Sequence, residues 1–206
     1  MRALHSLYAR DEGSGEPVLL LHGLMASQRV FDGIISRGKA THRFLAVDLP
    51  RSGKSGAWSS MAPAEIAAAL VEWLEGRGVR RAVVVGHSYG GLVALAMAEH
   101  HPQVVSRMVV ASVPALGLPS GSKDVFAHPV AEQLAGMIGK LPTARPILKN
   151  YLKLFLSGHP EAFNDAWVDG YLETLRAEGA WQAMLEAVRH VADYRLPTDL
   201  LRSRAL

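Results

Sequence analysis

The sequence predicts an α/β protein, in which helices cover both faces of a mostly parallel β-sheet. Two observations carry this prediction. Four short apolar runs are typical of buried parallel strands, and amphipathic helical patterns separate them. Strands that alternate with helices pack as a parallel sheet between two helical layers. The four runs are Val18–Leu21, Phe44–Val47, Ala82–Val85 and Met108–Ala111.

The first helix is expected between the first two of these strands. Ser27 is a good N-cap residue for it, and Gly38 provides its end. The residues before Gly13 have the pattern of one or two edge strands, which would precede the first buried strand. The apolar face of the helix is predicted to comprise Val30, Phe31, Ile34 and Ile35.

Two further helices are expected in the same layered arrangement. Pro63 suits the first turn of one of them, and Gly76 follows its last turn. The other starts directly after Ser88 and runs to His100, before the helix-breaking Pro102. The inward positions of the helix that starts at Pro63 are Ile66, Leu70, Trp73 and Leu74.

The pattern changes after residue 114, where helical segments follow one another without a strand between them. We therefore expect three parts: a core over residues 1–114, a helical cap over 115–197, and over 198–206 the start of a C-terminal core whose last strands are missing. The expected cap helices are Val125–Lys140, Ile147–Leu156, Glu161–Glu178 and Trp181–Tyr194.

The composition is that of an ordinary globular protein and excludes several classes of function. Lys and Arg number 22 against 19 Asp and Glu, and this small excess is spread thinly, so we expect no nucleic-acid or membrane-surface partner. The absence of cysteine excludes a disulfide framework and a cysteine nucleophile. No cluster of residues implies a metal or an organic cofactor. With neither a secretory signal nor a long apolar run, a cytoplasmic protein is expected.

The strongest chemical signal is the segment Gly86-His87-Ser88-Tyr89-Gly90, a G-x-S-x-G pattern between a β-branched strand and a helix. Such a sharp turn strains the backbone of the serine, so the neighbouring positions must be small. The hydroxyl would then stand at the start of a helix, where developing negative charge is favoured. The pattern predicts that Ser88 is a catalytic nucleophile. The alternative is an ordinary strand–helix turn with an inert serine.

A second apolar strand ends in His22-Gly23-Leu24-Met25. Acyl transfer at a serine needs two backbone N–H donors that hold the oxyanion. We expect one from Tyr89, directly after the nucleophile, and the other from Leu24, with Met25 as the less favoured candidate. His22 precedes the nucleophile in the chain, and we expect it to hold this loop by hydrogen bonds.

A third motif, Asp48-Leu-Pro-Arg51-Ser-Gly53-Lys-Ser55, follows the second strand. In this order and spacing, the three motifs resemble those of α/β-hydrolases of the esterase, lipase and peptidase-like branch. The resemblance is close from about Gly15 to Val113. Relatives usually have glycine where this chain has Arg51, and in them Asp48 is a turn residue and not a catalytic acid.

The resemblance implies that the catalytic acid and histidine follow the cap, in the order Ser, Asp/Glu, His. We find neither in this chain, so we expect a C-terminally truncated sequence that is inactive or weakly active. His190 is the least unfavourable substitute for the missing base. We also expect the last strand, Met108–Ala111, to have an uncovered edge through which the chain could associate with itself.

The function expected from these residues is that of a serine hydrolase with a small-molecule carboxylic ester or related acyl substrate. Epoxide hydrolases and haloalkane dehalogenases of this fold carry aspartate where this chain has Ser88. Two alternatives remain open. One is a non-catalytic protein that binds a small apolar ligand under the cap, and the other is a split enzyme that a second polypeptide completes.

Overall fold

The computed structural model describes residues 7–56, 58, 60–114, 117, 146, 149–150, 165–176 and 180–196. Its centre is a five-stranded sheet with the order β1-β3-β2-β4-β5. The four predicted strands are all present, and they pair with one another in parallel. One of the expected edge strands is also present, as β1, and it pairs antiparallel with β3. The strands are β1 (Ala9–Gly13), β2 (Glu16–Leu21), β3 (His42–Val47), β4 (Ala82–His87) and β5 (Val105–Ala111).

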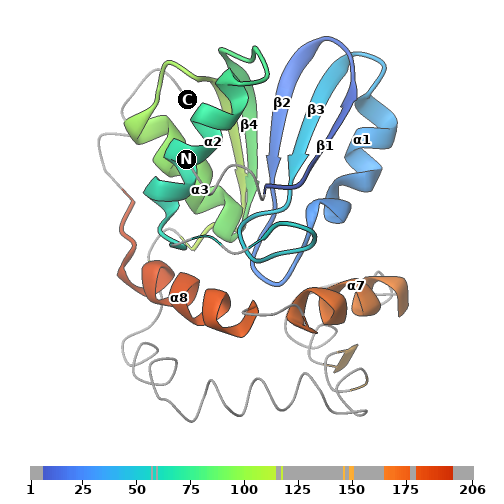
Figure 1. Ribbon diagram of the computed structural model, residues 1–206, viewed down its shortest axis with the longest axis vertical. Coiled ribbons are helices and arrows are strands. Elements are labelled where there is room, and N and C mark those ends of the chain that lie inside the picture. The colour runs from blue at the N-terminus through green and yellow to red at the C-terminus, as the bar shows by residue number, and fades with distance from the viewer. Residues whose placement is uncertain are drawn as a thin grey trace.

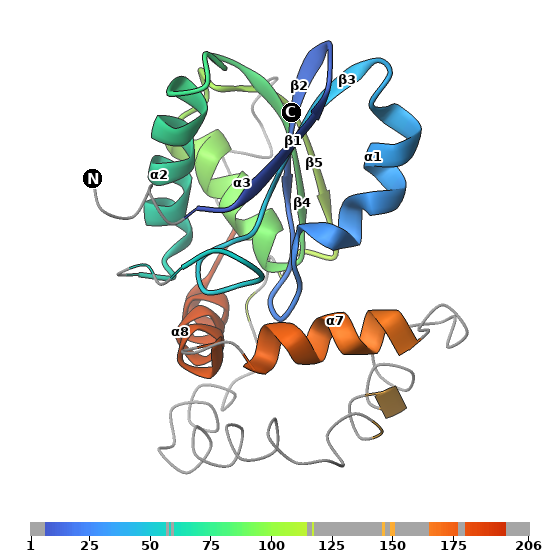
Figure 2. The same cartoon turned by 45° about the vertical axis from the view of Figure 1, so that its right-hand side comes forward.

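Helices cover both faces of this sheet, which confirms the predicted layers (Figures 1 and 2). Helices α2 (Pro63–Glu75) and α3 (Tyr89–His100) lie on one face and α1 (Asp32–Gly38) on the other. The predicted inward positions of α2 are all buried in the larger apolar core, together with most of α3. Because residues of a strand alternate between faces, Leu19 and Leu21 belong to this core, whereas Val18 and Leu20 belong to the smaller core under α1.

The first predicted helix is shorter than expected, and one of its positions was assigned wrongly. A 3₁₀ turn, η2 (Gln28–Phe31), precedes α1. Ser27 occupies the N-cap position but makes no side-chain capping hydrogen bond. Ile35 is buried, whereas Ile34 is 48% exposed. The change from three to 3.6 residues per turn rotates the apolar face, so a single helical period across the whole segment misplaces Ile34.

Strand β5 lies at the edge of the sheet and is much less buried than the other parallel strands. Val109 is 55% exposed and Val110 is 39% exposed, although they point to opposite faces. The expectation that all four apolar runs are fully buried is therefore wrong for β5. An exposed sheet edge offers unpaired backbone groups to another strand.

Two helices of the predicted cap are described, α7 (Asp165–Arg176) and α8 (Ala180–Asp193). Both lie beyond the carboxyl ends of the strands, on the side of the sheet where the turn at residue 88 is found (Figures 1 and 2). The predicted segments Val125–Lys140 and Ile147–Leu156, and residues 198–206, lie almost wholly outside the described residues. None of the helices described is long and apolar enough to cross a lipid bilayer.

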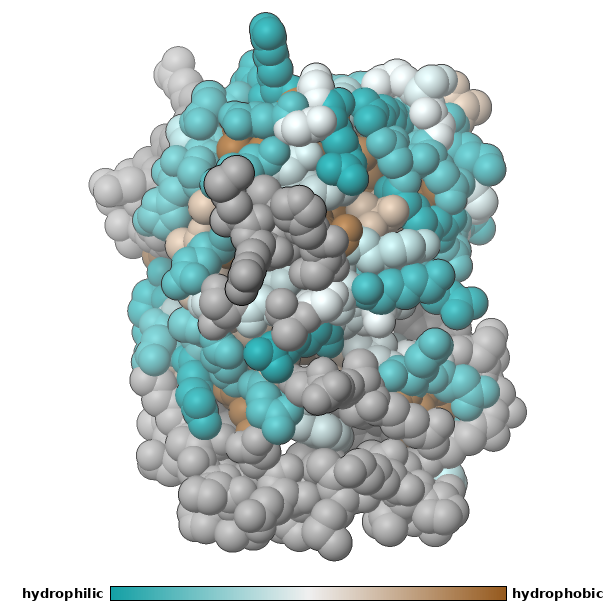
Figure 3. All heavy atoms as spheres, viewed as in Figure 1, coloured by the Kyte–Doolittle hydropathy of each residue, from teal (hydrophilic) through white to brown (hydrophobic). Residues whose placement is uncertain are grey.

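The surface in the view of Figure 3 is mostly hydrophilic where residues are described. Apolar side chains appear there only in small groups between polar ones. Most apolar residues of β2, β3, β4, α2 and α3 are buried in the two cores or packed against them.

Candidate active site

Ser88 lies in the turn between β4 and α3 with a backbone conformation that serine rarely adopts. Its φ is 53° and its ψ is −119°, outside both the helical and the extended regions. Its N–H donates a hydrogen bond to the carbonyl of Ala111 in the neighbouring β5, at 2.8 Å. The side chain is half-buried. The turn is therefore neither relaxed into helix nor packed into the interior.

Small residues surround this turn because other backbone segments touch it. A Cβ on Gly90 would overlap the carbonyl groups of Leu21 and His22 at the end of β2. A Cβ on Gly23 would lie 3.0 Å from the Cβ of Ser88, which is tighter than most real contacts. The loop after β2 thus lies directly against the serine, and glycine at both positions allows this approach.

The two predicted oxyanion donors flank Ser88. Leu24 follows Gly23 in the loop after β2, and Tyr89 is the first residue of α3. Neither N–H donates a hydrogen bond to a residue that the structure describes. Free backbone donors beside a nucleophile are the groups that stabilise an oxyanion. Met25, the less favoured candidate, has a φ of 60° and lies one residue further along the loop.

His22 is completely buried and joins the loops after β2 and β3. Its Nδ1 lies 2.7 Å from the carbonyl oxygen of Gly23, and its Nε2 lies 2.9 Å from the backbone nitrogen of Leu49. A carbonyl can only accept and an N–H can only donate, so Nδ1 carries the proton and the ring is neutral. Burial lowers the pKa of His22, which also favours the neutral ring. Both ring nitrogens are engaged, as expected for a loop-holding residue.

Asp48 holds the loop after β3 in place. Its buried carboxylate accepts hydrogen bonds from the backbone N–H of Gln28 at 2.7 Å and of Lys54 at 2.9 Å. Gly53, with a φ of 53°, lies so close that a Cβ would overlap this carboxylate. The hydroxyl of Ser55 donates to the carbonyl of Asp48 at 2.6 Å. These contacts are those of a turn residue.

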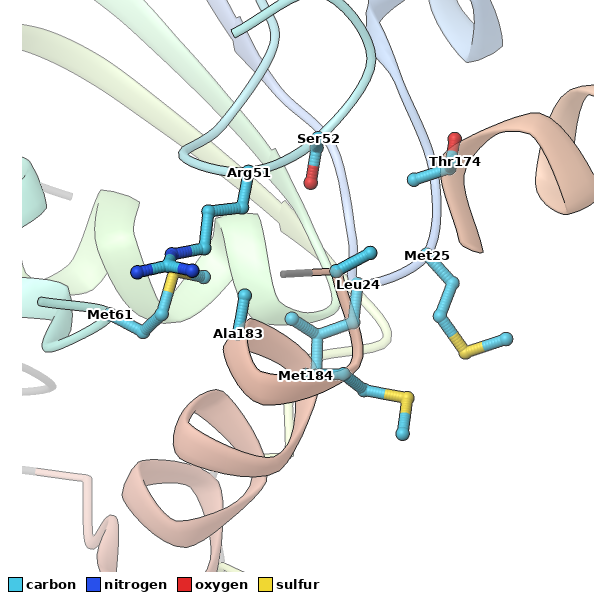
Figure 4. A pocket seen from close by; sticks show the side chains of 9 residues that line it. Leu24, Met25, Arg51, Ser52, Met61, Thr174, Ala183 and Met184 are labelled. Atoms are coloured by element: carbon cyan, nitrogen blue, oxygen red, sulfur yellow. The ribbon is translucent and has the colours of Figure 1, made fainter. Parts of the chain in front are cut away.

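A small, open pocket lies next to the loop that contacts Ser88. Three segments form it: the loop after β2, the connection from β3 to α2, and the two cap helices (Figure 4). Ser88 itself is not part of the lining, but the loop that touches Ser88 is. The lining residues are Leu24, Met25, Arg51, Ser52, Met61, Thr174, Ala180, Ala183 and Met184.

The sequence profile of the alpha/beta hydrolase family matches residues 18–205, nearly the whole chain. The chain belongs to the alpha/beta hydrolase family. The match includes the turn at Ser88, both neighbouring loops and helices α7 and α8.

Curated relatives agree with this assignment. The chain is 38% identical over 109 residues to a pimeloyl-[acyl-carrier protein] methyl ester esterase of Vibrio vulnificus, covering 52% of this chain and 41% of the relative. It is 33% identical over 172 residues to the enzyme of the same name from Neisseria meningitidis, covering 83% and 64% respectively. The chain thus spans less than two thirds of the length of either relative.

A solved structure shows the same fold. The esterase from Thermogutta terrifontis superposes with a TM-score of 0.75 at 18% identity, over 94% of this chain and 70% of the other chain. At this level of identity the likeness concerns the fold alone.

The sequence does not reveal how the cap helix α8 contacts the turn at Ser88. The hydroxyl of the buried Tyr89 donates to the carbonyl of Met61, and the N–H of Met61 donates to the carboxylate of Glu186 at 2.6 Å. Burial, with the nearby charge of Glu186, raises the pKa of Tyr89. Met61, in the β3–α2 connection, thereby links helix α8 to Tyr89, the residue after Ser88.

In the part of the chain that the structure describes, no histidine or carboxylate forms a hydrogen bond with Ser88 Oγ. His190 is half-buried on α8 and has no such bond. His87 is the adjacent residue, and burial lowers its pKa. Within the described residues, Ser88 Oγ thus has no hydrogen-bonded acid or base.

Proposed function

We propose that this chain carries the nucleophile and oxyanion hole of an esterase. The observation that carries the proposal is the strained turn at Ser88, directly after a central parallel strand, with the N–H groups of Leu24 and Tyr89 beside it. Strained backbone of this kind persists where the surrounding structure enforces it, and it concentrates at functional sites. The names of the relatives, which are methyl ester esterases, support a carboxylic ester as the substrate.

The proposed reaction is acyl transfer through Ser88. The Oγ attacks the ester carbonyl carbon, its proton passes to a base, and the N–H groups of Leu24 and Tyr89 hold the carbonyl oxygen as it becomes negative. The alcohol leaves with that proton, and water then hydrolyses the acyl-enzyme. The base and its acid come from residues outside the described part of the chain.

The position of the cap helices supports a small-molecule substrate. Because α7 and α8 lie over the carboxyl ends of the strands, they enclose the space next to the loop after β2 (Figure 4). We propose residues 1–114 as the catalytic core and 115–197 as the cap. Apolar side chains such as Leu24 and Met184 line the pocket beside polar ones, and they suit the hydrocarbon part of an ester.

A second candidate function is the binding of a small ligand without catalysis. It is favoured by one observation: within the described residues, Ser88 has no base in hydrogen-bonding contact. An active-site fluorophosphonate separates the two functions. Covalent labelling at Ser88 supports the esterase, whereas tight binding of a small apolar ligand without any labelling supports the binding protein.

A further inference from the structure

Arg51 lines the pocket beside Ser88 although its backbone conformation disfavours a side chain. Its φ is 55°, in the left-handed region where glycine is the usual residue. A backbone hydrogen bond from Arg51 N–H to the carbonyl of Gly56, at 3.0 Å, closes this turn. The chain therefore keeps a long cationic side chain at a position where a glycine would be conformationally easier.

The guanidinium of Arg51 has no acidic partner within the described residues. Its one hydrogen bond there is long, 3.4 Å from Nη2 to the carbonyl of Trp58. None of the ion pairs found among described residues involves Arg51. A half-buried guanidinium has five N–H donors arranged to match a carboxylate, and the described residues use little of this hydrogen-bonding capacity.

The rest of the pocket is suited to a short apolar chain. Leu24, Met25 and Met184 line one side of it, and Met61 lines the side toward which the Arg51 side chain extends (Figure 4). The hydroxyl of Ser52 is the polar group adjacent to Arg51 in the chain, and it forms no hydrogen bond with a described residue. A ligand that fits has an apolar stretch near Leu24 and a negative group at Arg51.

We propose that Arg51 is a specificity-determining residue that binds a carboxylate on the substrate, separated from the ester group by a short hydrocarbon chain. This inference rests on the proposed function, because Arg51 selects among esters that reach Ser88. A charge-assisted hydrogen bond in a partly desolvated pocket makes a difference of about 10- to 100-fold in affinity. The preferred substrate class is therefore the half-ester of a dicarboxylic acid.

The test compares two esters of equal chain length, 4-nitrophenyl hexanoate and mono(4-nitrophenyl) adipate, which differ only in the terminal carboxylate. We expect the unaltered chain to have a kcat/KM about 10-fold or more higher for the adipate. Arg51→Gln should lower kcat/KM for the adipate and abolish this preference. Arg51→Lys should retain part of the preference. The control is Arg80→Gln, which removes an exposed positive charge in the turn before β4 and should behave like the unaltered chain.

Calorimetric binding of monomethyl adipate and methyl hexanoate provides a readout that needs no turnover. Tighter binding of monomethyl adipate that is lost in Arg51→Gln supports the proposal even if neither nitrophenyl ester is hydrolysed. Absence of hydrolysis alone thus counts against the proposed function and not against Arg51. If the unaltered chain and Arg51→Gln show the same preference for the adipate over the hexanoate, in either assay, Arg51 does not bind the substrate carboxylate.

Discussion

The backbone N–H of Leu49 donates a hydrogen bond to Nε2 of His22 at 2.9 Å, and this bond joins the loops that follow two neighbouring strands. The same ring contacts the carbonyl of Gly23, which lies against Ser88. His22→Gln should therefore lower the free energy of unfolding at pH 7.5 by about 1–3 kcal/mol, because buried backbone groups lose their partners. Chemical denaturation measures this loss. The control His100→Gln, at an exposed position, should leave stability nearly unchanged.

The stability of the protein should also fall at acidic pH because of His22. Burial lowers its pKa in the folded chain, so the unfolded chain takes up a proton that the folded chain does not. The contribution of His22 is fully present above its unfolded pKa of about 6.5 and is lost as the pH falls below it. Unfolding curves between pH 5 and 8 should show a shallower pH dependence for His22→Gln. An unchanged slope would show that His22 is protonated in the folded state.

Gly53→Ala should be strongly destabilising, because the new Cβ would overlap the carboxylate of Asp48 in addition to the strain of a positive φ. We expect a loss of about 3 kcal/mol or more in the free energy of unfolding. Gly78→Ala is the matched control. Its φ is 71° but nothing lies within 4 Å of the new Cβ, so only the backbone strain of about 1 kcal/mol remains. Equal losses in the two variants would contradict the packing of Gly53 against Asp48.

Tyr89→Phe and Glu186→Ala should be coupled through Met61. Each change removes one hydrogen bond to this residue, at an expected cost of about 1–2 kcal/mol. A double-mutant cycle measured by denaturation should give a non-additive result, because the two bonds hold the same short segment. The control cycle uses Glu72→Ala, on the exposed face of α2, in place of Glu186→Ala. The stability changes of Glu72→Ala and Tyr89→Phe should add. Additivity in both cycles would argue against the connection between α8 and α3.

The edge at β5 should allow the chain to associate with itself. Val109 and Val110 are exposed there, next to a sheet edge that pairs with no strand among the described residues. Light scattering after size exclusion should reveal oligomers at high protein concentration, and Val109→Lys should reduce them. Ile34→Lys removes a similarly exposed side chain from α1 and should leave the association unchanged. A monomer at all concentrations would contradict this expectation.

The sheet was predictable because its strands are continuous runs of Val, Leu and Ala, which occur where helices cover both faces. The turn at Ser88 was equally visible, since Gly86 and Gly90 flank the serine at fixed spacing. The residue pattern could not predict that Ile34 is exposed, because the change of helical period at α1 depends on how the preceding 3₁₀ turn packs.

The contacts between distant segments could not be predicted. Glu186 and Met61 are 125 positions apart, and nothing in either local pattern indicates a hydrogen bond between them. The sequence shows that Arg51 replaces the glycine that is usual in relatives. The role proposed for Arg51 depends on the pocket, to which α7 and α8 contribute residues. The family resemblance supplied the expected roles of Leu24 and Tyr89, and the structure adds that no described residue occupies their N–H groups.

The nucleophilicity of Ser88 is tested most directly by the rate at which a fluorophosphonate modifies each serine, with every adduct located by mass spectrometry. The exposed Ser36 of α1 provides an internal reference in the same chain. Because oxyanion donors alone retain about 10³-fold of the catalysis in a serine hydrolase, Ser88 should react at least about 10-fold faster than Ser36. Replacing Ser88 with alanine should remove that adduct. Modification of Ser88 no faster than Ser36, or ester hydrolysis that persists in Ser88→Ala, would contradict the assignment.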